Sequence, residues 1–392
     1  MIPSIAAAVA LFYALGSLAL ALLFAARLRI PDDRLSARAT LVMPATGPLP
    51  GLENLLTTLT VQSLRPHRLI VAVESCEDPA YARLATFEHD SQLNIELVVA
   101  GLSPLRSQKC TNLLAALANL QPDDAYIVLL DADIRPQPWW LAALVAPLAA
   151  GRADVVNGYR WPVPIILSPS AALVAGIDRA IALLPRLSQA RPIWGGSLAV
   201  TRRALEILDL PSTIGRTLTE DLPIGDRAAE TGLRVLTRRA VRPITPLSGS
   251  FLDLWRFGRR QYQLIRLYRP GLWFFAAFVV STDLISRAVL LSFLATRSPA
   301  LAAILALACL GSIATEIRLA IGEKLGAADR IGFLISQHTL AWTILLTPAF
   351  HASVVWGGVV TSPVVWAHIR YIVDRTGQVI EVARRPHSDQ SI

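Results

Sequence analysis

The chain has 392 residues, of which 53% are hydrophobic and 17% are charged, and its mean hydropathy is +0.48. This composition excludes an ordinary soluble domain and predicts membrane segments. The net charge of +8 is carried almost entirely by arginine, since Lys109 and Lys324 are the only lysines. Arginine suits diphosphate and anionic headgroups, although the positive-inside bias of a membrane protein explains the same charge. No basic tract mixed with aromatic residues indicates nucleic-acid binding.

The first predicted element is a membrane span. Ile5 to Ala26 is apolar and uncharged, and about 20 such residues cross a bilayer. Four arginines follow it directly, which predicts an anchor over residues 1–29 and a cytosolic domain after it: Arg27, Arg29, Arg34 and Arg38. A cleaved signal peptide is the alternative, but it would have a basic start and a shorter apolar region.

The next region, residues 30–270, has the pattern of an α/β domain. Short apolar runs alternate with segments of helical period, such as Leu52, Leu55, Leu56 and Leu59. Continuous apolar strands separated by helices predict a mostly parallel sheet covered on both faces, which binds ligands at the carboxyl ends of its strands. The predicted strands are Leu41–Met43, Leu69–Val73, Ile95–Val99, Tyr126–Leu130 and Asp154–Asn157.

One apolar segment inside this region, Ala171 to Leu184, is too short to span and carries Asp178 and Arg179. It predicts either an interfacial helix lying on the membrane or a buried helix of the α/β domain.

Residues 271–367 are apolar again and predict three or four carboxy-terminal spans. Leu272–Ala295 and Pro299–Ala320 are each long enough to span. The third block, Ile331–Trp366, predicts two short spans or one span with a re-entrant piece. An even number returns residues 368–392 to the cytosol, which favours four. This tail alternates weakly and predicts a hairpin with Thr376-Gly377 at its turn.

The sharpest motif is the strand Tyr126–Leu130 running into Asp131 and Asp133. Two carboxylates at this spacing in an extended segment lie on one side of the chain. They suit Mg²⁺ or Mn²⁺, which prefer oxygen ligands and would hold the phosphates of a nucleotide donor. A loop cap or turn is the alternative.

A second acidic motif, Thr219-Glu220-Asp221, precedes an apolar helix that runs through Ala229. A carboxylate in a cleft can remove the proton of an acceptor hydroxyl, which makes Asp221 the candidate base. Capping of the helix by Thr219 or Asp221 is the alternative, and both hold if Glu220 caps while Asp221 catalyses.

A basic motif lies before the carboxy-terminal spans, with Arg256, Arg259 and Arg260 beside aromatic residues. These arginines are either interfacial anchors or a clamp for a diphosphate.

Three further positions are candidates for substrate binding. Glu74 ends the second strand, where an acid can accept hydrogen bonds from a nucleotide, although a solvated turn explains it as well. Lys109 opens a helix whose amino terminus favours phosphate. Gly196 lies in the loop Trp194–Ser197, which lets the backbone approach a ligand closely.

In this order and spacing, the motifs from Thr40 to Leu267 resemble the membrane-bound nucleotide-sugar transferases of family 2 type with the GT-A fold. Within that class the chain looks most like ceramide glucosyltransferases and their bacterial relatives, family 21. The motif Cys76-Glu77-Asp78-Pro79-Ala80 is similar to the family's first acidic motif, and Lys109 to Leu113 matches its Lys-x-x-Asn-Leu.

The resemblance implies an inverting transfer of glucose or galactose from a uridine diphosphate sugar to a membrane lipid. Asp131 and Asp133 would hold the metal, and Asp221 would be the base. Glu74, Asp78, Lys109, Asp131, Gly196, Glu220 and Arg256 would bind substrate. The family's Gln/Arg-x-x-Arg-Trp motif lacks its Trp here: Arg256-x-x-Arg259 is one match, and Phe257-x-x-Arg260-Gln261 is another with Gln in the Trp place.

Three other functions remain open from the sequence. A processive polysaccharide synthase would share the domain, but the missing Trp and the few spans argue against it. A polyprenyl-phosphate sugar transferase is a closer enzyme alternative. A membrane scaffold or transporter with a degenerate α/β domain is the non-enzymatic one. The expected location is the bacterial inner membrane, with the catalytic domain in the cytosol.

Overall fold

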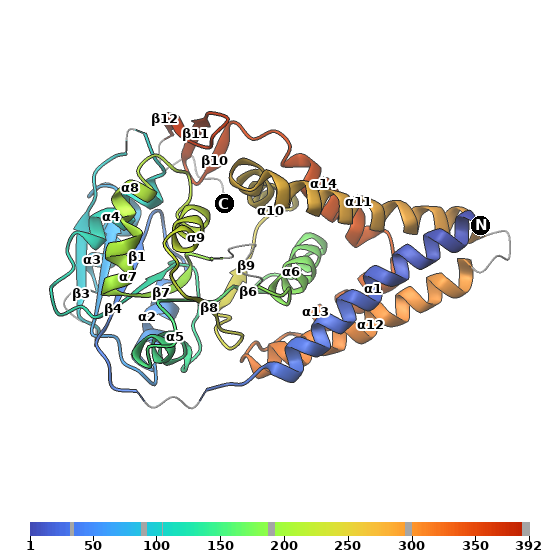
Figure 1. Ribbon diagram of the computed structural model, residues 1–392, viewed down its shortest axis with the longest axis horizontal. Coiled ribbons are helices and arrows are strands. Elements are labelled where there is room, and N and C mark those ends of the chain that lie inside the picture. Colours follow the sequence, from blue (N-terminus) through green and yellow to red (C-terminus); the bar gives the residue numbers. More distant parts are fainter. Residues whose placement is uncertain (32–34, 88–91, 104, 187–192, 295–299, 386–392) are drawn as a thin grey trace. The chain divides into compact units, whose positions relative to one another are not determined.

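The computed structural model describes residues 1–31, 35–87, 92–103, 105–186, 193–294 and 300–385 (Figure 1). Three positions named above, Arg34, Ala295 and Pro299, lie outside the described residues. The chain divides into two compact units. The helical unit comprises Met1–Leu28, Trp161–Pro185 and Pro246–Thr361, and the α/β unit comprises Arg29–Arg160, Arg186–Thr245 and Ser362–Ile392. The α/β unit is therefore assembled from three separate stretches of chain.

The α/β unit contains a seven-stranded sheet in the order β3-β2-β1-β4-β7-β5-β8. Its strands are β1 (Ala39–Pro44), β2 (Arg68–Val73), β3 (Ile95–Val99), β4 (Tyr126–Leu130), β5 (Val155–Asn157), β7 (Ser197–Thr201) and β8 (Val235–Thr237). All neighbours are parallel except β7, which is antiparallel to β4 and β5. The mostly parallel sheet expected from the sequence is confirmed.

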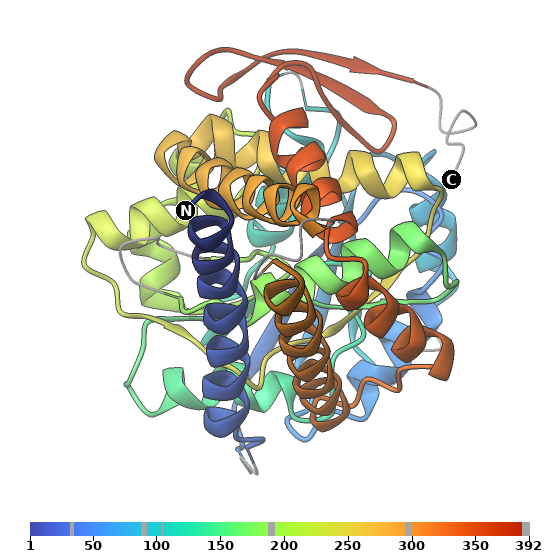
Figure 2. The same cartoon turned by 90° about the vertical axis from the view of Figure 1, so that its right-hand side faces the viewer.

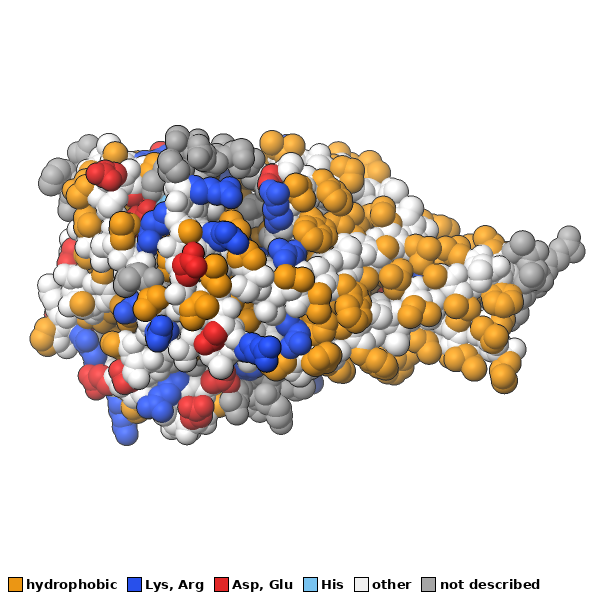
Figure 3. All heavy atoms as spheres, turned by 90° about the horizontal axis from the view of Figure 1, so that it is seen from above, with side chains coloured by type: hydrophobic (Ala, Val, Ile, Leu, Met, Phe, Trp, Pro, Cys, Tyr) orange, Lys and Arg blue, Asp and Glu red, His pale blue; other side chains and the backbone are white. Residues whose placement is uncertain are grey.

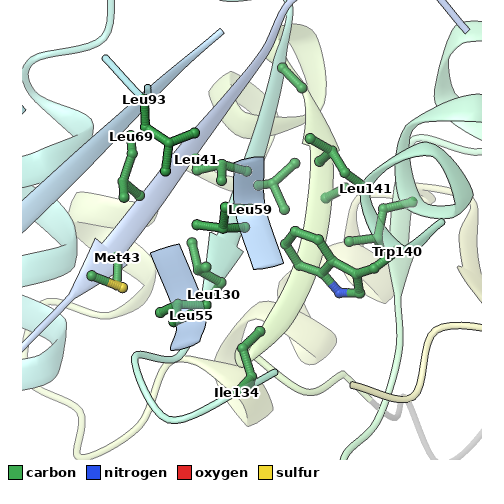
Figure 4. Packing of buried hydrophobic residues seen from close by; sticks show 14 of the residues in the cluster. Leu41, Met43, Leu55, Leu59, Leu69, Leu93, Leu130, Ile134, Trp140 and Leu141 are labelled. Carbon is green, nitrogen blue, oxygen red and sulfur yellow. The ribbon is translucent and has the colours of Figure 1, made fainter. Parts of the chain in front are cut away.

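Helices cover both faces of this sheet (Figure 1). They are α2 (Leu52–Thr60), α3 (Pro79–Ala85), α4 (Gln108–Leu117), α5 (Trp140–Ala149), α7 (Arg202–Leu208), α8 (Leu210–Thr213) and α9 (Asp221–Glu230). Successive side chains of a strand point to opposite faces, so Leu41 and Met43 join the core under α2 and α5 while Val42 joins the core under α4. Figure 4 shows the first of these cores, with Trp140 packed beside Leu141.

The carboxy-terminal residues form a small antiparallel sheet of β10 (Val364–Trp366), β11 (Ile369–Val373) and β12 (Val379–Arg384). Gly377 adopts a φ of 83° in the turn between β11 and β12, a conformation that favours glycine. The hairpin expected in the tail is confirmed, and it belongs to the α/β unit.

The helical unit consists of α1 (Ile2–Arg27), α6 (Pro169–Ala182), α10 (Phe251–Tyr268), α11 (Pro270–Ser292), α12 (Ala300–Lys324), α13 (Ile331–Trp342) and α14 (Leu346–Gly357), with β6 (Trp161–Pro164) paired to β9 (Ile244–Leu247). Helix α1 packs along α11 and α12 (Figure 2). Large side chains of α11 point outward, and Phe275 and Phe278 are 65% and 64% exposed. Figure 3 shows that hydrophobic side chains dominate the visible surface of the membrane-type helices, as expected for helices that face lipid.

Three helices, α1, α11 and α12, are long and apolar enough to cross a membrane. Helices α13 and α14 have 12 residues each and meet at 88°. Each rises only about 18 Å, too little to cross a bilayer alone, so the pair makes one broken span or a re-entrant piece. Of the three or four carboxy-terminal spans expected, three is the most that the described helices allow.

The short apolar helix expected at residues 171–184 is α6. Its polar residues Asp178 and Arg179 are buried, and Arg179 binds both carboxylate oxygens of Asp329 at 2.7 Å. Helix α6 packs on α10, α13 and α14, so it is a helix of the helical unit. Its contact with a bilayer stays a prediction.

Candidate active site

The candidate site lies at the edge of the sheet where the parallel strands end. Strands β1, β2 and β4 run in the same direction, so their carboxyl ends meet at one edge, and the antiparallel β7 begins there. Leu130 pairs with Ser197, and the next amide, that of Asp131, donates to the Gly196 carbonyl at 3.4 Å. Strand direction therefore brings the acidic motif after β4 beside the glycine loop before β7.

Lys109 reaches this edge from the first turn of α4. Ser107 caps that helix by accepting a hydrogen bond from the Cys110 amide at 3.2 Å. The Lys109 Nζ lies 2.6 Å from Asp131 Oδ1 and 2.7 Å from Glu220 Oε1. One ammonium group thus connects the acid that follows β4 with the acid that precedes α9.

Glu220 and Asp221 enter the site at the start of α9. Glu220 is 1% exposed and occupies the N-cap position of α9, but its side chain makes no capping hydrogen bond: its carboxylate is turned toward Lys109 instead. The Thr219 hydroxyl donates to Asp221 Oδ1 at 2.8 Å and fixes the orientation of that carboxylate.

Two glycines make room for these acids. A Cβ atom on Gly195 would overlap Glu220 Oε1, and a Cβ atom on Gly196 would overlap Asp131 Oδ2 and the Trp194 ring. The glycine loop was expected to let the backbone approach a ligand. In the structure it is the two carboxylates that approach this backbone, and Gly195 makes the same kind of close contact as the predicted Gly196.

Burial and charge shift the ionisation of this cluster. Burial raises the pKa of Glu220 to about 8, with help from Asp221 and Asp131 and against the attraction of Lys109. For Lys109, burial acts to lower the pKa, but Asp131, Glu220 and Asp221 outweigh it and the pKa rises well above its usual value. The lysine therefore stays charged at neutral pH.

Asp133 also has a raised pKa, at about 6. The surrounding protein removes hydration from its carboxylate, and the charge of Asp131 adds to the effect, although the residue keeps an exposed surface. Lys109 and Arg160 oppose the shift without cancelling it. An excess of negative charge thus remains around Asp131 and Asp133.

Binding of a divalent cation by these two carboxylates stays a prediction, and it would need further ligands from the substrate. Among the residues that the structure describes, no group of three or more His, Cys, Asp or Glu side chains is arranged to hold a metal ion. Mg²⁺ is commonly held by one or two carboxylates together with substrate phosphates and water. A cation between Asp131 and Asp133 would relieve the repulsion that raises the pKa of Asp133.

The acids after β2 are engaged within the α/β unit. Asp78 is 1% exposed, caps α3 by accepting from the Ala80 amide at 2.9 Å, and accepts from Thr46 Oγ1 and the Gly47 amide, both at 2.8 Å. Its carboxylate holds the loop after β1 against the start of α3. Glu74 is also buried, and its Oε1 lies 2.8 Å from His368 Nε2 in the tail. Their contact with a nucleotide stays a prediction.

The predicted arginine motif lies on α10 of the helical unit. Arg259 donates from Nε to the Gly357 carbonyl at 2.8 Å, and Arg256 is exposed and 3.8 Å from Asp253. Arg260 lies over the Phe257 ring at 5.8 Å, and Gln261 donates to the Phe257 carbonyl at 3.4 Å. Arg259 is thus held by a backbone carbonyl of α14. Contact of these side chains with a diphosphate stays a prediction.

The contacts of the carboxy-terminal tail with the candidate site were not predicted from the sequence. His368, Tyr371 and Arg384 contact Glu74 or the start of α4, and Trp366 faces Lys109. Their only signal in the sequence was weak alternation, which predicts strands but not the surface on which they pack.

Several solved structures resemble the chain at low identity. A mannosyltransferase from Pyrobaculum calidifontis in complex with GDP-Man and Mn²⁺ is 17% identical, with 91% of this chain and 99% of that chain covered and a TM-score of 0.44. Glucosyl-3-phosphoglycerate synthase from Mycobacterium tuberculosis with Mn²⁺ and UDP-glucose is 18% identical (59% and 78% covered, TM-score 0.38). TarS from S. aureus with UDP-GlcNAc is 12% identical (78% and 90% covered, TM-score 0.40).

No curated protein sequence matches the chain significantly. A family profile does match, and it covers nearly the whole chain, from residue 2 to residue 377. The match includes the first predicted span, the acidic edge of the sheet and the carboxy-terminal helices. The chain belongs to glycosyl transferase family 21.

Proposed function

We propose that this glycosyltransferase moves glucose or galactose from a uridine diphosphate sugar to a membrane lipid, such as ceramide or a related lipid. The observation that carries the proposal is the junction made by Lys109, which lies 2.6 Å from Asp131 and 2.7 Å from Glu220. It gathers the acidic motif after β4 and the acidic motif before α9 at one edge of the sheet, beside Asp221.

Asp221 acts as the base in this proposal. The acceptor hydroxyl attacks the anomeric carbon, a new C–O bond forms, and the bond to the diphosphate breaks as the nucleotide leaves. Asp221 takes the hydroxyl proton, and the hydrogen bond from Thr219 holds its carboxylate in place. A single displacement of this kind inverts the anomeric centre.

Asp131 and Asp133 would hold Mg²⁺ or Mn²⁺ in this scheme, and the bound ion would supply positive charge to offset the charge of the leaving diphosphate. Lys109 keeps Asp131 oriented and adds positive charge beside the phosphates. Binding of the diphosphate by Arg256, Arg259, Arg260 and Gln261 is proposed from the family resemblance of their motif alone.

The lipid nature of the acceptor is supported by the helical unit. Helices α1, α11 and α12 are long and apolar enough to span, and α11 exposes large aromatic side chains. A reaction beside the bilayer suits an acceptor that never leaves it. Arg27 ends α1, and Arg29 and Arg38 follow it, so the positive-inside bias supports a cytosolic α/β unit. We propose a bacterial inner membrane as the location.

We infer the membrane topology from chain connectivity. The chain leaves the α/β unit before Pro246 and returns to it at Ser362, so it crosses the bilayer an even number of times in between. Helices α11 and α12 make two crossings. We infer that α13 and α14, which meet at 88°, enter and leave by the same face as a re-entrant piece.

The test is the substitution Asp221→Asn, with Glu230→Gln at the exposed end of α9 as the matched control. Loss of a positioned base costs about 10²- to 10⁴-fold in rate. We expect Asp221→Asn to lose lipid glycosylation by this factor and to keep its affinity for uridine diphosphate, measured by calorimetry. Full transfer by Asp221→Asn would refute the assignment.

Mass spectrometry of the lipids from expressing cells identifies the product. One sugar on a lipid supports the proposal. A long polymer would indicate a processive synthase, and an acid-labile sugar phosphate would indicate a polyprenyl-phosphate transferase.

A further inference from the structure

The carboxy-terminal sheet β10–β12 packs firmly within the α/β unit. Four of its side chains are nearly inaccessible: Val364, Ile369, Tyr371 and Val379 are between 0% and 3% exposed. The Val379 amide donates to the Arg216 carbonyl at 2.8 Å, and Gln378 bridges Thr217. Arg216 and Thr217 lead directly into Glu220 and Asp221, so the tail is packed within the unit and joined to the segment that carries the proposed base.

Tyr371 meets the amino terminus of α4. Its hydroxyl accepts a hydrogen bond from the Gln108 amide at 3.0 Å. The first amides of a helix have no partner within the helix and otherwise bind water or an anion. Tyr371 occupies one of them, and the next residue is Lys109. The tail therefore fixes the turn from which the lysine reaches Asp131 and Glu220.

His368 and Arg384 meet the end of β2. His368 Nε2 lies 2.8 Å from Glu74 Oε1, and both residues are at most 5% exposed. Arg384 lies 4.0 Å from the other oxygen of Glu74 and donates to the Ser103 carbonyl at 2.9 Å and to Gln108 Oε1 at 2.8 Å. The acid at the end of β2 is thus oriented by two cationic or hydrogen-bonding groups of the tail.

Trp366 completes the set, since Lys109 Nζ lies 5.9 Å from the centre of its ring. A cation at this distance from an indole face is attracted to it. The tail therefore contacts all three segments that carry candidate site residues: the end of β2, the start of α4 and the approach to α9.

We propose that the tail sheet helps to form the donor site, and that Tyr371 and His368 are positioning residues in it. Tyr371 holds Lys109 through the first turn of α4, and His368 holds Glu74, so that both are placed for the nucleoside diphosphate part of the donor. This inference rests on the proposed function for what Lys109 and Glu74 bind. It adds that nucleotide affinity depends on residues of the tail, more than 250 positions away along the chain from Lys109 (Tyr371 and Gln108 are 263 apart).

The variants Tyr371→Phe and His368→Ala test this in the full-length protein. The control is Arg370→Gln, an exposed position on the same strand β11. Each lost hydrogen bond should weaken binding of uridine diphosphate about 5- to 10-fold, measured by calorimetry with Mn²⁺. The KM of the lipid acceptor should change less than twofold. His368→Gln should restore most of the affinity, because its amide can still donate to Glu74.

Hydrogen exchange of the segment 105–112 gives a second readout that needs no nucleotide. Tyr371→Phe should speed exchange of the Gln108 amide, and Arg370→Gln should not. Equal nucleotide affinity in Tyr371→Phe, His368→Ala and Arg370→Gln would overturn the inference, as would unchanged exchange in Tyr371→Phe. If the unmodified protein binds no uridine diphosphate, the proposed function fails, and faster exchange in Tyr371→Phe would still support the contact of the tail with α4.

Discussion

The two edges of the central sheet differ in how their charged side chains are balanced. Each carboxylate of the amino edge has partners, whereas the carboxyl edge has an excess of negative charge. At the amino edge, Arg68 begins β2 and binds Asp124 at 2.5 Å and Glu96 at 2.7 Å. Asp124 is fully buried and also accepts hydrogen bonds from Thr40 and from the Gln121 amide. Burial acts to raise the pKa of Asp124, but these hydrogen bonds outweigh it and the pKa is lowered.

At the carboxyl edge the charges are not balanced. One lysine, Lys109, faces Asp131, Glu220 and Asp221, and the pKa values of Glu220 and Asp133 are raised. At the amino edge Arg68 pairs with both Asp124 and Glu96, whereas at the carboxyl edge Asp131 and Glu220 share the single charge of Lys109. A buried ion pair with matched partners is structural, whereas a set with excess negative charge has affinity left for a cation, a proton or a substrate.

Removing the positive charge of Lys109 at the carboxyl edge should have the largest effect on activity. In Lys109→Met, Asp131 and Glu220 lose their shared partner, and we expect kcat/KM for the sugar donor to fall at least about 100-fold, as for loss of a preorganised electrostatic group. The chain's other lysine supplies the control, Lys324→Met at the end of α12. A kcat/KM within threefold of the control would show that the junction made by Lys109 is dispensable.

Removing the positive charge of Arg68 at the amino edge should instead lower the free energy of unfolding. Arg68→Met leaves Asp124 buried without its ion pair, which costs about 3–5 kcal/mol of the free energy of unfolding. The folded enzyme should keep its donor KM within twofold. Thermal unfolding in detergent and kinetics below the transition measure the two quantities. A raised donor KM with unchanged stability would reverse the distinction between the edges.

The glycine loop should show a smaller effect. In Gly196→Ala the new methyl group overlaps Asp131 and the Trp194 ring, so Asp131 or the loop must move. Overpacking of this kind costs about 1–3 kcal/mol, and displacement of Asp131 should weaken donor binding as well. In the control Gly51→Ala the methyl group meets open space. Equal nucleotide affinity in the two variants would show that Asp131 does not need this close packing.

The two edges should also give opposite slopes of stability against pH. Glu220 has a raised pKa of about 8, so its contribution is fully present below the pKa of the unfolded chain and is lost as pH rises toward 8. Asp124 has a lowered pKa, so its contribution is present above the unfolded pKa and is lost as pH falls. Glu220→Gln should flatten the fall in stability between the ordinary glutamate pKa of 4.5 and about 8, and Asp124→Asn should flatten the fall below the ordinary aspartate pKa of 3.8. Unfolding experiments that extend from strongly acidic to mildly alkaline pH measure both ranges. Identical profiles for the two variants would contradict this division.

The sequence predicted the parallel strands and their helices because burial on both faces leaves continuous apolar runs, as in Leu69–Val73. It did not predict that β7 is antiparallel, since Ser197–Thr201 has the same buried pattern and strand direction is set by tertiary connection. Asp131, Asp133 and Asp221 were predicted as site residues from their position after a strand or before a helix, and their roles stay predictions. The contacts of His368 and Tyr371 were not predicted, because pairing across more than 250 residues leaves no local pattern.

Binding of Mn²⁺, followed by electron paramagnetic resonance, tests the central claim most directly. We predict that the protein binds Mn²⁺ more tightly when uridine diphosphate is present, because the phosphates complete the ligands that Asp131 and Asp133 begin. Affinity should fall as pH drops through about 6, where Asp133 takes up a proton. It should be lost in Asp133→Asn and kept in Asp124→Asn at the opposite edge. Nucleotide-independent binding, or equal binding by Asp133→Asn, would contradict a cation site at the carboxyl edge of the sheet.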